Sequence, residues 1–222
     1  LMRASGSQMY RLLMRSAKET VLKTAERKSG CRPGLVMTLH TWGQRMNFHV
    51  HVHIMLSGGG LRLLNNPDTR KTEILPQWVP LEAGSEVCDK NYLAAALKKT
   101  YLRRLIALMK SNQLDWPRAQ PVPPLISRQR GDTPRKRARP VRELCPEEEQ
   151  LISKLKSQSW IADCPPADTE YTGSEALVNS LAAYVSGTAI SDRRLLSIDG
   201  DTVQFTIKDY RQKKKVTSEQ LS

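Results

Sequence analysis

The stretch Asn47-Phe48-His49-Val50-His51-Val52-His53-Ile54-Met55-Leu56 decides the fold, because imidazole and aliphatic side chains alternate along it. Successive side chains of a β-strand point to opposite faces, so the three histidines share one face of a predicted strand. Neutral imidazole binds divalent metals, and ligands at positions i and i+2 lie roughly 7 Å apart. We therefore predict a metal site at His49, His51 and His53, in preference to a half-buried strand whose histidines simply face water.

The flanking segments predict an α+β fold in which helices flank a mostly antiparallel central sheet. Residues 35–42 form a second expected strand, and the turn at 43–47 should pair it antiparallel with the histidine strand. His40 lies on that strand, but a single strand histidine is more often structural, so we leave it out of the site. Gly58-Gly59-Gly60 should end the hairpin, and prolines make residues 74–80 unsuitable for a central strand.

Helical periodicity of apolar residues predicts four helices, the last of which carries a tyrosine. The expected ranges are 8–28, 90–110 after an Asp89 N-cap, 146–157 and 172–187. Tyr184 lies in the last turn of the fourth helix, where a tyrosine is usually a core residue when only the sequence is considered. A hairpin is expected beyond it, with strands at 193–198 and 202–210.

The composition favours a polyanionic partner. The chain has 222 residues, a formal net charge of +13 and a pI near 9.8, which favour nucleic acid or an anionic surface. Insertion into a membrane is not expected, because no apolar run is long enough to span a bilayer. The four cysteines have no C-x-x-C spacing and are expected to be reduced thiols of a cytoplasmic protein.

Changes in composition divide the chain into four expected parts. These are the N-terminal part of a catalytic-type domain at 1–116, a basic proline-rich linker or insertion at 117–145, the C-terminal part of the domain at 146–212, and a polar tail at 213–222. The linker holds an arginine cluster that ends at Arg142. Such a segment either binds nucleic acid through counterion release or is an ordinary loop.

Two groups of motifs carry a family resemblance. The first group comprises LHTWGQ at 39–44, the histidine alternation at 49–53 and GGGL at 58–61; the second comprises LAAYV at 181–185, AISDRRLL at 189–196 and FTIKDY at 205–210. In order and spacing they resemble the rolling-circle transposases of the insertion sequence ninety-one family, which are HUH endonucleases. The likeness extends from about Tyr10 to Tyr210 and is interrupted by the basic segment.

This resemblance implies a transposase that nicks and rejoins single-stranded transposon ends. His51 and His53 fill the HUH motif, in which U is a hydrophobic residue, and His49 is an additional candidate ligand. The implied cofactor is Mg²⁺ or Mn²⁺, which polarises the scissile phosphate. The implied nucleophile is Tyr184, whose attack leaves a 5′-phosphotyrosine link. DNA is therefore the expected partner, with no role for a membrane.

The chain departs from the family pattern near the tyrosine and at its ends. Many relatives carry two tyrosines four residues apart, whereas Ser180 occupies the first position here, and Gly187 stands where relatives have a basic residue. A cysteine-rich zinc domain and a strand before Tyr10 are missing, so we expect a truncated copy. Two alternatives stay open: an inactive remnant that only binds DNA, and a metal-dependent enzyme on an unrelated β-scaffold that does not use Tyr184.

Overall fold

The computed structural model describes residues 6–66, 71–81, 87, 89–114, 141–164, 178, 182, 189–209 and 215–221. The chain forms two compact units. The first contains Leu1–Leu35 and Leu56–Pro166, and the second contains Val36–Met55 and Ala167–Ser222. The hairpin that carries the histidines therefore contributes residues to both units.

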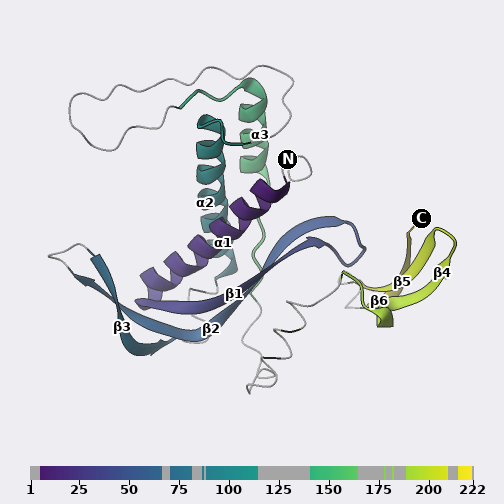
Figure 1. Ribbon diagram of the computed structural model, residues 1–222, viewed down its shortest axis with the longest axis horizontal. Helices are drawn as coiled ribbons and strands as arrows, with labels where there is room; N and C mark the ends of the chain where they lie inside the picture. Colours follow the sequence, from purple (N-terminus) through teal and green to yellow (C-terminus); the bar gives the residue numbers. More distant parts are fainter. Residues whose placement is uncertain are drawn as a thin grey trace. The chain divides into compact units, whose positions relative to one another are not determined.

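Three helices build the hydrophobic core of the first unit: α1 (Gly6–Ser29), α2 (Lys90–Lys110) and α3 (Pro146–Ser157). They confirm the first three predicted helices, and the Asp89 side chain caps α2 by accepting from the amides of Asn91 and Tyr92. Figure 1 shows α2 beside α3, with α1 crossing them. The buried core residues are Met9, Leu12, Tyr101, Leu102, Leu105, Met109, Leu114 and Ile152.

A buried ion pair fixes the chain immediately before α3. The side chains of Arg142 and Glu148 are fully buried with a nitrogen–oxygen distance of 2.6 Å, and Glu148 also accepts from the Cys145 amide at 3.1 Å. Burial alone would raise the pKa of Glu148, but hydrogen bonds from Arg142 and Cys145 bring that pKa down to about 2. We expected Arg142 at the end of a basic linker or insertion. Its side chain is instead buried, and its charge is neutralised by Glu148.

The first sheet has three strands in the order β1-β2-β3: β1 (Cys31–Trp42), β2 (Phe48–Asn66) and β3 (Lys71–Pro80). The first two confirm the predicted histidine hairpin. The glycines, however, do not end it, because β2 runs through them to Asn66.

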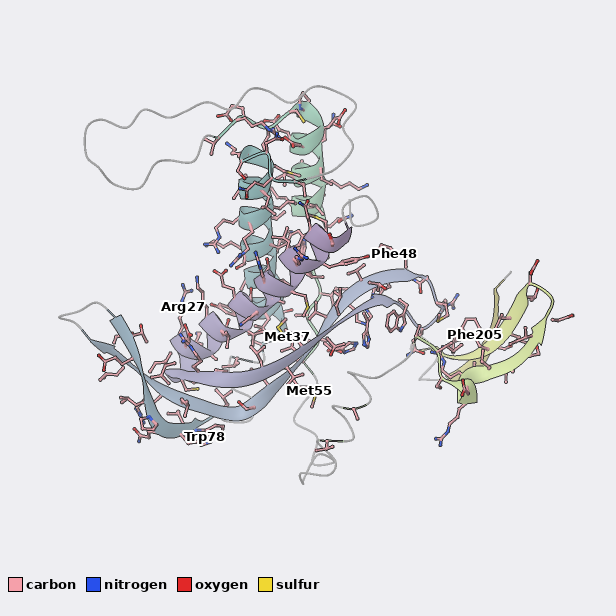
Figure 2. All side chains as sticks on the ribbon, viewed as in Figure 1. Arg27, Met37, Phe48, Met55, Trp78 and Phe205 are labelled. Atoms are coloured by element: carbon pink, nitrogen blue, oxygen red, sulfur yellow. The ribbon has the colours of Figure 1, made fainter. Side chains whose placement is uncertain are left out.

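Close packing explains why glycine occurs there. A Cβ at Gly60 would lie 2.5 Å from the backbone of Arg32, and a Cβ at Gly59 would lie 2.5 Å from the ring of Trp78, which Figure 2 labels on β3. These glycines therefore allow neighbouring strands and a large indole to approach the middle strand, instead of forming a turn.

Prolines occur in the two outer strands of this sheet and not in β2. Pro33 lies in β1, and Pro76 and Pro80 lie in β3. Proline has no N–H to donate to a neighbouring strand, so it is tolerated at a sheet edge. The β2–β3 pairing is irregular between Leu61 and Leu63, opposite the segment that contains Pro76. The expectation that residues 74–80 could not form a central strand agrees with the position of β3 at the edge.

The second sheet is also antiparallel and has the order β4-β5-β6: β4 (Leu195–Asp199), β5 (Thr202–Asp209) and β6 (Lys215–Leu221). The β4–β5 hairpin confirms the prediction for this region. Phe205 and Ile207 of β5 are buried, and Figure 2 labels Phe205. Residues 215–221, which we expected in a polar tail, pair with β5 instead, because a backbone ladder does not require apolar side chains.

These elements confirm the α+β class and the antiparallel sheet flanked by helices. Most of the predicted tyrosine helix at 172–187 lies outside the described residues. Within it, Val178 and Ala182 are described, and both have helical backbone. None of the described helices combines the length and the apolar character needed to cross a membrane.

Candidate metal centre

Three histidines from two neighbouring strands come together in the second unit. His40 lies on β1, and His51 and His53 lie on β2. One ring nitrogen from each of the three side chains lies within 4.8 Å of the other two, and all three side chains are half-buried. Nitrogens this close can bind one divalent ion after small rotations about the side-chain bonds.

The three rings contact one another. The ring centroid of His40 is 4.5 Å from that of His53 and 5.5 Å from that of His51, and the two β2 rings are 4.8 Å apart. Trp42, two residues along β1, stacks on His40 with a centroid distance of 4.8 Å and an interplanar angle of 16°. This stacking restricts rotation of the His40 imidazole, so one indole and three imidazoles lie in contact.

The electrostatics of the cluster keep His53 neutral. Burial lowers the pKa of His53 to about 4, and charge on His40 or His51 acts in the same direction. At neutral pH His53 is therefore in the form whose nitrogen lone pair can bind a metal. His51 Nδ1 lies 3.0 Å from the carbonyl oxygen of His49, so the tautomer with a proton on Nδ1 donates this bond and presents Nε2 as a ligand atom.

His49 lies beside the cluster. Its ring centroid is 5.0 Å from that of His51, but its side chain is exposed and its ligand atoms are not among those that converge. The site predicted from the sequence was His49, His51 and His53; the structure brings His51 and His53 together with His40 instead. Their assignment as metal ligands stays a prediction.

Strand pairing was the signal that could have found His40. The turn at 43–47 brings residue 40 beside the histidine strand, whereas alternation along one strand identifies only residues on that strand. Tyr184 and Ser180 lie outside the described residues, so the catalytic role expected of Tyr184 also stays a prediction.

The fold and the cluster define an α+β protein with a three-histidine site suited to a divalent ion. The chain belongs to the transposase family whose model is described as "Putative transposase" and matches residues 34–222. This confirms the family resemblance found in the motifs.

Two curated relatives support the same family. The chain is 26% identical over 205 residues to "Putative transposase y4qJ" of Sinorhizobium fredii (strain NBRC 101917 / NGR234). The aligned stretch covers 91% of this chain and 43% of that protein. The chain is 43% identical over 49 residues to "Transposase for insertion sequence element IS801" of Pseudomonas savastanoi pv. phaseolicola, which covers 22% of this chain and 12% of that protein. The chain thus spans less than half the length of these relatives. No solved structure matches it.

Proposed function

We propose that this chain provides the nicking and rejoining centre of a rolling-circle transposase that acts on single-stranded DNA at the ends of an insertion sequence. The observation that carries the proposal is the convergence of His40, His51 and His53 in a chain of the transposase family. Three imidazole nitrogens that converge from two strands suit a bound divalent cation.

The donor set supports a divalent transition-metal ion. Imidazole nitrogens suit such ions, whereas Mg²⁺ prefers oxygen ligands, so Mn²⁺ fits these histidines better than Mg²⁺ does. His40, His51 and His53 would hold the ion, with His49 as an additional candidate ligand at the exposed side. When bound, the ion polarises the scissile phosphate and stabilises the charge that develops on its oxygens.

Tyr184 is the proposed nucleophile. An unperturbed tyrosine hydroxyl has a pKa of about 10, so the proton must leave as the oxygen attacks. A new bond forms between the tyrosine oxygen and phosphorus, and the bond from phosphorus to the 3′ oxygen breaks. The departing 3′ oxygen takes up a proton and becomes a hydroxyl. The phosphotyrosine link conserves the energy of the broken phosphodiester bond for rejoining. The net charge of +13 favours the approach of the DNA strand.

A covalent adduct tests this function. Purified chain is incubated with Mn²⁺ and labelled single-stranded oligonucleotides from the ends of its insertion sequence, and the products are separated under denaturing conditions. We expect a protein–DNA adduct that disappears in Tyr184→Phe and persists in the matched control Ser180→Ala. An equal adduct in Tyr184→Phe would reject this nucleophile.

The DNA-binding remnant makes a different prediction in the same preparation. It would form no adduct, and its salt-dependent binding of DNA would be unchanged in His51→Ala and His53→Ala.

A further inference from the structure

The Arg194 side chain links the turn between the two histidine strands to the second sheet. We propose that Arg194 is a positioning residue that fixes this turn, residues 43–47, relative to the chain segment that follows Tyr184. The inference rests on the proposed function for its catalytic consequence, but the attachment itself can be tested without any activity.

The Arg194 guanidinium makes hydrogen bonds to two segments far apart in the sequence. Its Nη2 donates to the Gln44 carbonyl at 2.7 Å, and its Nε donates to the Thr206 carbonyl of β5 at 2.9 Å. Both bonds lie within the second compact unit. The planar fork of an arginine holds both acceptors at fixed angles, which a lysine ammonium cannot do.

The rest of Arg194 is immobilised by its surroundings. Its backbone ends the short 3₁₀ helix η3 (Asp192–Arg194), and its amide donates to the Ser191 carbonyl at 2.8 Å. Its guanidinium carbon lies 5.7 Å from the ring centroid of Phe205, which is fully buried. Because the side chain is only half-buried and its charge lies over an aromatic face, it can reach Gln44 at a small desolvation cost.

The turn that Arg194 holds is strained. Met46 has a φ of 56°, in the left-handed region that a residue with a Cβ rarely adopts. Two internal bonds hold the turn, from the Gly43 amide to the Asn47 carbonyl at 2.9 Å and from the Met46 amide to the Gly43 carbonyl at 3.0 Å. The charge-assisted bond from Arg194 to the Gln44 carbonyl adds a contact from outside the turn, and strained backbone persists where the surroundings hold it.

The position of this turn affects both strands that carry the histidine cluster. It joins the strand of His40 to the strand of His51 and His53. Arg194 lies ten residues after Tyr184 in the sequence. One side chain therefore attaches the strands that carry the proposed metal ligands to the segment that leads from the proposed nucleophile. Without it, the histidines would keep their mutual arrangement through strand pairing, but the turn would lose its attachment to β5.

Hydrogen exchange tests the attachment directly. In Arg194→Gln, we expect amide exchange in a peptide covering 43–48 to be about tenfold faster than in the wild type, because a hydrogen bond from a charged donor is lost. Exchange in a β5 peptide covering 202–207 should change much less, because the ladders with β4 and β6 also hold that strand. The matched control is Arg193→Gln, which removes an equal charge from an exposed neighbouring side chain and should leave both peptides as in the wild type.

Two results would overturn the attachment. One is unchanged exchange at 43–48 in Arg194→Gln, and the other is an equal increase in Arg193→Gln. If Arg194→Gln also loosens β5, Arg194→Lys decides, because it keeps the charge over Phe205 and loses the fork. Faster exchange limited to 43–48 then supports the attachment, and exchange equal to the wild type rejects it.

The catalytic consequence is tested by comparing binding with reaction. Arg194→Gln should slow single-turnover adduct formation by about tenfold while the dissociation constants for Mn²⁺ and for the oligonucleotide stay within about twofold, and Arg194→Lys should be intermediate. Equal loss of Mn²⁺ binding and of rate would show that Arg194 only supports the histidines, which rejects the positioning role. If the folded wild type forms no adduct, the proposed function fails, and the exchange experiment still decides whether Arg194 holds the turn.

Discussion

The helical core of the first unit and the histidine cluster of the second unit differ in what their contacts do. In the core, Leu105 and Met109 are fully buried among other apolar side chains, so the contacts that position them also stabilise the fold. In the cluster, His40, His51 and His53 are half-buried against one another, and burial and the neighbouring imidazoles lower the pKa of His53. The sheet holds the cluster in place, and the cluster should contribute little to the free energy of unfolding.

The largest effect is expected at the buried ion pair of the first unit. Glu148→Ala leaves the Arg142 guanidinium buried without its carboxylate and should lower the free energy of unfolding by about 3–5 kcal/mol. The matched control is Glu143→Ala, because Glu143 pairs with Lys110 at 3.4 Å and its side chain is 73% exposed. This control should cost less than about 1 kcal/mol. Urea denaturation of both variants measures the difference, and equal losses would contradict it.

The next effect is expected in the apolar core. Leu105→Ala removes a fully buried side chain from the contact between the helices and should destabilise the protein by about 2–5 kcal/mol in thermal or chemical unfolding. Ile161→Ala serves as the control, because Ile161 is 87% exposed and its truncation should change stability by less than about 0.5 kcal/mol.

In the histidine cluster, we expect a substitution to change metal binding strongly and stability only slightly. His51→Ala should weaken Mn²⁺ binding by about 100-fold, measured by calorimetry, because it removes one of three converging nitrogens. The same variant should change the free energy of unfolding without metal by less than about 1 kcal/mol. His40→Ala should behave like His51→Ala, whereas His49→Ala should retain most of the affinity. A loss of several kcal/mol in metal-free His51→Ala would show that the cluster is a structural element after all.

A smaller effect is expected in the middle strand of the first sheet. In Gly60→Ala the added methyl group would meet the Arg32 backbone, and the strain should cost about 1–3 kcal/mol. Gly58→Ala is the matched control, since nothing lies within 4 Å of a Cβ at that position. Thermal unfolding of the two variants should separate them, and equal stability would show that β1 can move away from β2.

The effect that is smallest per step of the experiment is a dependence of stability on acidity. The pKa of Glu148 is about 2 in the folded protein and 4.5 in an ordinary glutamate, so the unfolded chain binds more protons between these values. Stability should therefore fall as the pH drops below 4.5 towards 2, with a slope of at most about 1.4 kcal/mol per pH unit from this group. Glu148→Gln should lose that part of the slope when unfolding is measured at several pH values.

The sequence predicted elements that depend on local pattern. The periodicity of apolar residues located α1, α2 and α3, and the alternation of histidine and valine located β2. It also predicted the β4–β5 hairpin, because Asp199-Gly200 is a strong turn signal between two alternating segments.

Features set by contacts between distant residues could not be predicted in this way. His40 joins the cluster through strand pairing, and Arg142 is buried because Glu148 neutralises its charge. Gly59 and Gly60 were expected to end the hairpin, because consecutive glycines are typical of turns. The sequence does not show that a bulky neighbour such as Trp78 packs over them. The role of Tyr184 depends on its distance from the cluster, and it stays a prediction.

The prolines in the outer strands affect whether the sheet edges of two molecules can pair. A sheet edge with free N–H groups can pair with the edge of another molecule and start aggregation. Pro33 removes one such donor from β1, Pro76 and Pro80 remove two from β3, and the irregular pairing at Leu61–Leu63 distorts the ladder beside the second edge. The sheet edges are therefore poor templates for joining the sheets of several copies of the chain into a fibre.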